Sequence, residues 1–196
     1  MTIAVLRNLI VETLRDPART ARYLMSLRIA PEALWTGLGL VAVLNTLLFS
    51  LSDMLVPGPA PLPGVFASPI VYFLLVAAAL VLTVYALFWT GRLFGGTGGV
   101  DQILVLIVWL QSLRLLVQVI TLVLALTIPA LSLLVVLFAA VAGLYITLHF
   151  VNEAHRLGSL FRSSGVLVAT ALAIVLGLSL VLSLIGGPVL GVAAHV

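Results

Sequence analysis

Residues 103–150 decide the fold, and they read ILVLIVWLQSLRLLVQVITLVLALTIPALSLLVVLFAAVAGLYITLHF. These 48 residues contain one Arg, Arg114, and no Asp, Glu or Lys. A straight helix of this length would be about 70 Å long, more than twice the roughly 30 Å hydrocarbon core of a bilayer. The apolar run is interrupted at Thr127, Ile128 and Pro129. The stretch therefore predicts a tight hairpin of two transmembrane helices.

The composition of the whole chain agrees with a membrane protein. Of its 196 residues, 63% are hydrophobic and 8% are charged, with a mean hydropathy of +1.35. Soluble domains are about half apolar and about a quarter charged. A soluble core could not hide so much apolar surface, so lipid must cover it. The formal net charge of +3 is too small to indicate a nucleic-acid partner, and the absence of Cys excludes disulfides and Cys-based metal sites.

Working outward from the hairpin, further apolar stretches of about 20 residues bring the total to five. The predicted spans lie at about 33–54, 69–90, 103–126, 130–150 and 165–186. They predict an all-α polytopic membrane bundle over 31–186, with a short tail at 187–196. The linker after the first span should be an extended loop outside the bilayer, because it has proline at alternate positions, Pro57, Pro59, Pro61 and Pro63. The glycine-rich stretch 91–101 predicts a flexible turn between the second and third spans.

The N-terminal segment 1–30 is expected to form two short helices. Its first part is amphipathic, with one apolar face made of Ile3, Leu6, Ile10 and Leu14. Such a helix is typical of the membrane interface. Asp16 followed by Pro17 predicts the N-cap and first residue of a second helix that ends near Leu27. The two helices could have a specific role at the membrane surface, or they could simply cap the cytoplasmic end of the bundle.

The distribution of arginine predicts the orientation. The N-terminal segment carries Arg7, Arg15, Arg19, Arg22 and Arg28, whose side chains are available to lipid phosphates. Arg92 lies in the second loop, and Arg156 and Arg162 lie in the fourth. With five spans, every arginine outside the spans falls on one side of the membrane, which is the positive-inside pattern. We therefore expect a bacterial inner-membrane protein with a cytoplasmic N-terminus and a periplasmic C-terminus.

Two stretches carry a resemblance to a known family. They are Asp16-Pro17-Ala18-Arg19-Thr20, ahead of the first span, and residues 91–102, GRLFGGTGGVDQ, between the second and third. With the five-span layout, they resemble the Yip1 family of integral membrane proteins. The resemblance implies a five-helix membrane bundle with a cytoplasmic N-terminus. Eukaryotic members are implicated in vesicle traffic and bind prenylated small GTPases, partly through a longer hydrophilic N-terminal region. For short, bacteria-like members it implies a membrane-organising role.

One polar stripe lies within the third span. Gln111, Arg114, Gln118 and Thr121 fall on one narrow face of that helix. An arginine at the centre of a membrane helix costs about 2.5–3.5 kcal/mol, so the charge should face protein or water. Asn45 lies at a similar depth in the first span, and we therefore expect these two spans to touch. The stripe could bind a lipid headgroup, a small anion or a partner's carboxylate, or it could be a buried polar cluster that fixes helix register.

The sequence gives little support for catalysis or metal binding. His149 and Glu153 share a helix face and form a weak candidate pair for a divalent metal. Interfacial polar residues that close a helix explain this pair equally well, so no metal or cofactor is expected. Phosphate loops and a nucleophile and base at one depth are absent from the pattern. We expect a protein that is not an enzyme.

Three functional hypotheses remain. The first is a non-enzymatic protein of Yip1 type that organises membrane or binds lipid and partner proteins. The second is an accessory or assembly subunit of a larger membrane complex. A small transporter is less favoured, because transporters usually have internal repeats and several broken helices. Ala169, Ala173 and Gly177 recur every four residues in the fifth span, a spacing that permits close helix packing within the bundle or self-association.

Overall fold

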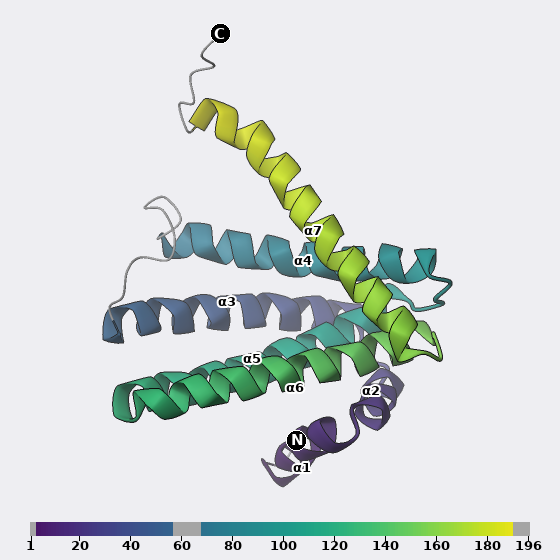
Figure 1. Cartoon of the computed structure of the whole chain (residues 1–196), viewed down its shortest axis with the longest axis horizontal. Coiled ribbons are helices and arrows are strands. Elements are labelled where there is room, and N and C mark those ends of the chain that lie inside the picture. The colour runs from purple at the N-terminus through teal and green to yellow at the C-terminus, as the bar shows by residue number, and fades with distance from the viewer. Residues whose placement is uncertain (1–2, 57–67, 190–196) are drawn as a thin grey trace.

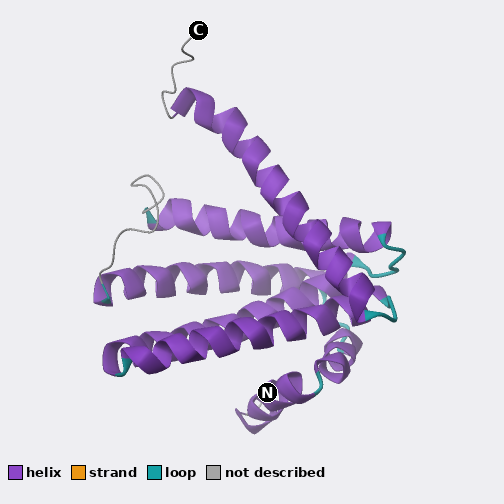
Figure 2. Ribbon diagram, viewed as in Figure 1, coloured by secondary structure: helices purple, strands orange, loops and turns teal. Residues whose placement is uncertain are grey.

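The computed structural model describes residues 3–56 and 68–189, which form seven helices and no strand. Two short helices, α1 (Ile3–Arg15) and α2 (Pro17–Ser26), precede the bundle (Figures 1 and 2). The five long helices are α3 (Pro31–Leu55), α4 (Pro69–Leu93), α5 (Val100–Thr127), α6 (Pro129–His155) and α7 (Leu160–Val189). Each long helix has the length and apolar composition to cross a membrane. The predicted all-α polytopic bundle with an N-terminal amphipathic helix is confirmed.

Each predicted span lies inside one long helix, and the helices extend beyond it. The longest fully described one, α5, has 28 residues, which corresponds to about 42 Å and exceeds the roughly 30 Å core. Helix ends must therefore project into the headgroup region. Helix α7 runs to Val189, into the predicted tail 187–196. The rest of that tail and the proline-rich stretch 57–63 lie outside the described residues.

Local sequence signals set the helix boundaries. Asp16 caps α2, since its Oδ1 accepts a hydrogen bond of 2.9 Å from the Arg19 amide. Proline occupies the first helical position, where its missing N–H costs nothing, in four helices, at Pro17, Pro31, Pro69 and Pro129. The α5–α6 hairpin turns at Ile128 alone, whose amide donates to the Leu124 carbonyl and whose carbonyl accepts from Ser132. The predicted N-cap and the predicted hairpin are both confirmed.

The long helices run alternately up and down through the bundle, and α7 departs from it at an angle (Figure 1). Helix α3 contacts α4 and α5, and α6 lies along α5. The expected contact between the first and third spans is therefore confirmed. Helix α7 crosses α4 and α6 near its own start, and α2 packs against α5 and α6.

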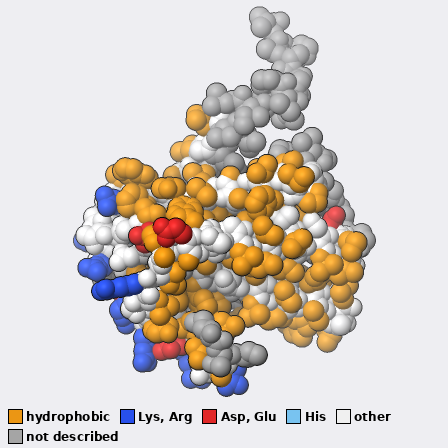
Figure 3. Space-filling view, turned by 180° about the vertical axis from the view of Figure 1, so that it is seen from behind, with side chains coloured by type: hydrophobic (Ala, Val, Ile, Leu, Met, Phe, Trp, Pro, Cys, Tyr) orange, Lys and Arg blue, Asp and Glu red, His pale blue; other side chains and the backbone are white. Residues whose placement is uncertain are grey.

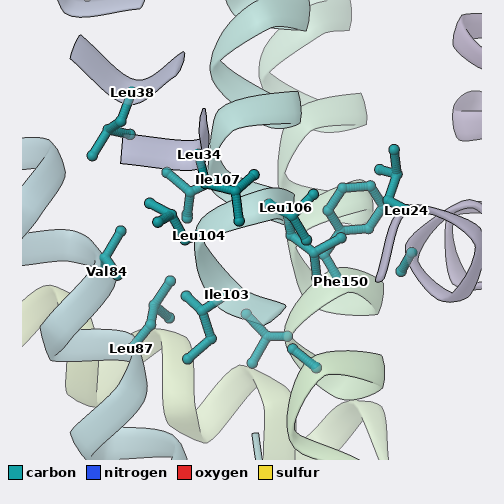
Figure 4. Close-up of a cluster of buried hydrophobic side chains, with 14 of the residues drawn as sticks. Leu24, Leu34, Leu38, Val84, Leu87, Ile103, Leu104, Leu106, Ile107 and Phe150 are labelled. Atoms are coloured by element: carbon teal, nitrogen blue, oxygen red, sulfur yellow. The ribbon is translucent and has the colours of Figure 1, made fainter. Parts of the chain in front are cut away.

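Burial is concentrated at one end of the bundle. We call the packed end the half where α3, α5 and α7 begin, α4 and α6 end, and α1 and α2 attach; the opposite half is the open end. Among the described residues, the buried side chains of the long helices lie in the packed end or within about one turn of the helix midpoint, as in the ranges 34–46, 80–91, 103–115 and 146–155. Figure 4 shows part of this core, including Leu104 and Phe150, which are almost completely buried. Arginine side chains gather toward the same end, while hydrophobic side chains cover much of the remaining face (Figure 3).

Candidate functional site

Helix α1 is attached to the bundle by a face that sequence periodicity did not indicate. Leu9 and Thr13 are buried, and the Thr13 hydroxyl accepts a hydrogen bond of 3.1 Å from the Trp109 indole N–H on α5. The predicted apolar stripe lies on a neighbouring face, where Leu6 and Leu14 remain exposed. Helix α1 therefore has one apolar face on the protein and another that is free of it.

The position of Trp109 sets the depth of α1. Trp109 follows the first residue of α5 by nine residues, or about 14 Å. If α5 is centred in the bilayer, its start projects about 6 Å beyond a 30 Å core. Trp109 then lies about 8 Å inside the boundary, within the 5–10 Å range of interfacial helices. The docked helix is thus at the right depth for its free apolar face to meet lipid.

The arginines of the N-terminal segment divide into two groups. Arg7 and Arg15 are exposed on α1, and Arg19 pairs with Glu12 across the α1–α2 junction at 3.2 Å. Arg22 instead pairs with Glu153 at the end of α6, with 2.6 Å between Nη1 and Oε1. Arg22 and Glu153 belong to a cavity of about 430 Å³, lined also by Met25, Ser26, Arg28, Gln102 and Arg156. We call it the basic cavity.

His149 and Glu153, the weak candidate pair for a divalent metal, have other partners in the structure. The Glu153 carboxylate is engaged by Arg22. The His149 ring packs edge-on against Tyr145, with 4.7 Å between ring centroids. Within residues 3–56 and 68–189, no three His, Asp or Glu side chains are grouped so that they could hold a metal ion.

The glycine-rich stretch forms a cradle for a histidine that sequence reasoning missed. His155 is 1% exposed, and its carbonyl accepts a hydrogen bond of 3.1 Å from the Thr97 amide. A Cβ at Gly91 would overlap the imidazole, and one at Gly98 would lie 2.8 Å from Nδ1. The Leu87 carbonyl lies near the ring, but neither ring nitrogen makes a hydrogen bond of normal geometry to a residue that the structure describes. The stretch forms the predicted turn between α4 and α5, and its glycines also permit close packing around His155.

The predicted polar stripe does not form one site. Arg114 is exposed on the bundle surface and makes no ion pair or hydrogen bond within the described residues. The Tyr72 hydroxyl on α4 lies within electrostatic range of its guanidinium. Gln111 is half-buried on the same helix, and Asn45 is buried on α3 without a side-chain hydrogen bond to a described residue. A functional role for these residues stays a prediction.

The outer part of the stripe lines a second cavity, at the open end. This cavity has a volume of about 350 Å³ and lies between α3, α5 and α6. Gln118 and Thr121 contribute to its wall, and the buried Gln118 Oε1 has no hydrogen-bond partner among the described residues. The remaining lining residues are Leu48, Phe49, Ser52, Val56, Leu122, Ala125, Ser132 and Val136. The wall is mostly apolar.

The family of the chain follows from its match to a family model. The model of the Yip1 domain matches residues 11–193, nearly the whole chain. The chain belongs to the Yip1 domain family. Comparison with curated proteins and with solved structures gave no match.

In this Yip1 domain, the two stretches that suggested the family are contact points of the packed end. Asp16 caps α2 and so positions the helix that carries Arg22. The loop after α4 surrounds His155 with Gly91, Gly96 and Gly98. Both stretches thus serve to bring α2, the α4–α5 loop and the end of α6 together beside the basic cavity.

Proposed function

We propose that this Yip1 domain protein is a non-enzymatic protein of the bacterial inner membrane that organises the bilayer by holding α1 in the cytoplasmic leaflet. Its N-terminus would be cytoplasmic and its C-terminus periplasmic, in keeping with the positions of the arginines. The observation that carries the proposal is the docking of α1 through Thr13 and Trp109, which leaves Leu6 and Leu14 exposed.

This arrangement would affect only one of the two leaflets of the bilayer. The free apolar face of α1 displaces lipid in one leaflet, while Arg7 and Arg15 lie on its exposed surface. Each arginine near an anionic membrane surface contributes about 1 kcal/mol of attraction. A helix inserted into a single leaflet expands that leaflet alone, so it is sensitive to membrane curvature. The bundle fixes the helix at one depth and gives every copy the same effect.

The location of α1 can be tested because the chain has no Cys. An environment-sensitive dye on Ile10→Cys, in vesicles containing spin-labelled lipid, should be strongly quenched. The same dye on Asn8→Cys, which lies on the polar face of α1, should be quenched much less. Equal, weak quenching at both positions would show that α1 does not enter the leaflet.

The organising activity needs a separate measurement. Labelled protein in giant vesicles should concentrate in thin tubes pulled from the flat membrane. Leu14→Gln should reduce this enrichment, because it places a polar group on the free apolar face. Val5→Gln is the matched control, since Val5 is exposed and lies about 180° around α1 from Leu14. The proposal fails if the wild-type protein shows no preference for tubes, or if both variants behave alike.

A second function is favoured by one observation: Arg114 is exposed and has no ion-pair partner in residues 3–56 and 68–189. Arg114 is 14 residues from the start of α5, or about 21 Å along a 42 Å helix, and so near mid-membrane. A charge at that depth needs a partner, which a carboxylate of another subunit would supply. Purification in mild detergent should then yield a stoichiometric second protein that is lost in Arg114→Leu. This role is contradicted if the Arg114→Leu variant is more stable than the wild type and still co-purifies with the same protein and lipid.

A further inference from the structure

The basic cavity is assembled from segments far apart in the sequence. Arg22 comes from α2, Arg28 from the linker to α3, and Arg156 from the end of α6. All three side chains are exposed, and they converge on a space of about 430 Å³. The cavity lies at the packed end, where the helix ends project beyond the bilayer core.

The protein itself engages only some of the polar groups of the cavity. Arg22 pairs with Glu153, whereas the Arg28 and Arg156 side chains have no hydrogen bond or ion pair within the described residues. Gln102 accepts a hydrogen bond from the Gly99 amide through Oε1, which leaves its NH₂ group available as a donor. Three guanidinium groups against one carboxylate leave the cavity with a net charge of +2.

The backbone conformation of Arg28 and Arg156 supports a specific role for these two arginines. Among the described non-glycine residues, Arg28 (φ 46°) and Arg156 (φ 53°) are the two with positive φ. Arg156 follows α6 in the left-handed conformation, a position that usually holds glycine. Unfavourable backbone conformations of this kind gather at functional sites, and both examples here line the same cavity.

We propose that the basic cavity binds one phosphate monoester dianion. Guanidinium groups donate paired hydrogen bonds to phosphate oxygens, and the charge of about −1.5 to −2 on a phosphate monoester matches the +2 of the cavity better than the single charge of a diester. A lipid headgroup and a soluble phosphate ester share this chemistry. The inference deepens the proposed function and rests on it for the location of the cavity at the cytoplasmic membrane surface.

Calorimetric titration of the full chain in detergent micelles tests the proposal. The probes are dioctanoyl phosphatidic acid, dioctanoyl phosphatidylglycerol and glycerol 3-phosphate. Phosphatidic acid should bind saturably at one per chain and about tenfold more tightly than phosphatidylglycerol, because it forms more charge-assisted hydrogen bonds. Equal binding of glycerol 3-phosphate also supports the site and makes a soluble ester its ligand; binding of phosphatidic acid alone makes the ligand a lipid.

The variants separate binding from folding. Arg28→Gly and Arg156→Gly each remove a guanidinium and also relieve the left-handed backbone, so affinity should fall about tenfold while the melting temperature stays equal or rises. Glu153→Gln should have the opposite effect and tighten binding several-fold. The matched control is Arg19→Gln, which removes the same charge from α2 outside the cavity and should leave affinity unchanged.

Two outcomes overturn the site: no saturable binding of any probe, or an equal loss of affinity in Arg19→Gln and Arg156→Gly. The dye on Ile10→Cys separates this failure from that of the proposed function. Quenched dye without saturable binding removes the site alone. Unquenched dye with the expected variant pattern removes the membrane role of α1 and leaves the anion site in place.

Discussion

The packed end and the open end of the bundle are both built from long apolar helices but are held together differently. At the packed end, the end of α6 is enclosed by α2 and the α4–α5 loop, and Phe150 is 1% exposed. At the open end, the first half of the same helix exposes Leu133, Leu137 and Phe138 by about two thirds each. Here a cavity of about 350 Å³ separates α3 from the α5–α6 hairpin.

The difference shows what holds apolar helices together in a bilayer. Lipid tails solvate leucine as well as another helix does, so hydrophobicity alone does not bring helices into contact. The packed end has what is needed in addition: glycines that allow close approach to His155, and the inter-helix Thr90–Thr170 and Thr13–Trp109 hydrogen bonds. The open end leaves its apolar side chains to lipid.

The largest contrast should come from shortening one phenylalanine at each end of α6. Phe150→Ala should lower the free energy of unfolding in detergent by about 3–5 kcal/mol, because it leaves a cavity in a close-packed region. Phe138 is 67% exposed, and Phe138→Ala should change stability by less than about 0.5 kcal/mol. Similar losses for both would abolish the distinction between the two ends.

A smaller effect is expected from adding one methyl group in the glycine cradle. Gly91→Ala should cost about 1–3 kcal/mol through overpacking against the His155 ring. Gly143→Ala is the control, because a Cβ there meets nothing within 4 Å, and helix propensity should make it neutral or stabilising by up to about 1 kcal/mol. In a double-mutant cycle, His155→Ala should remove much of the cost of Gly91→Ala, and strict additivity would argue against the cradle.

Two threonines of α4 should respond differently to the same substitution. The Thr90 hydroxyl forms a 2.7 Å hydrogen bond with Thr170 on α7, so Thr90→Val should cost about 0.6–1.7 kcal/mol in thermal unfolding. The Thr83 hydroxyl bonds only to the Ala79 carbonyl of its own helix, and Thr83→Val should be close to neutral. If the two substitutions have equal effects, the Thr90–Thr170 bond does not anchor α7.

The smallest effect is expected where the packed end meets solvent. The Arg19 and Glu12 side chains are 72% and 41% exposed, and solvent-exposed ion pairs contribute little. Glu12→Gln should change the midpoint of unfolding by less than the equivalent of about 0.5 kcal/mol at physiological salt. A larger loss, measured by the same thermal assay, would mean that charge rather than packing secures α1 on α2.

The main features of the fold could be predicted from sequence because they depend on long apolar stretches or on short motifs of neighbouring residues. Five apolar stretches of membrane length specify five helices, and Asp16-Pro17 specifies the start of α2. The break at Thr127–Pro129 specifies a hairpin because no other arrangement fits 48 residues into a bilayer. The contact between α3 and α5 also followed, from the similar depths of Asn45 and Arg114.

The docking face of α1, the cradle around His155 and the basic cavity could not be predicted to the same degree. A membrane helix is apolar on all sides, so periodicity does not separate its protein-facing side from its lipid-facing side. On α1, the apolar arc was broad enough to hold both the docked pair, Leu9 and Thr13, and the exposed residues Leu6 and Leu14. The cradle around His155 and the place of Arg156 in the basic cavity depend on contacts between distant loops, which residue spacing along one helix does not encode.

The one-residue turn between α5 and α6 bears on how the protein is made. Between Arg114 and Glu153 the chain contains no Asp, Glu, Lys or Arg, and the turn itself satisfies the amides of Ile128, Leu131 and Ser132 within the hairpin. In the proposed orientation, no charged side chain and almost no backbone without a hydrogen bond has to cross the membrane when this hairpin is inserted. The pair is suited to enter the bilayer as a preformed unit, which gives α3 and α4 a partner surface during biosynthesis.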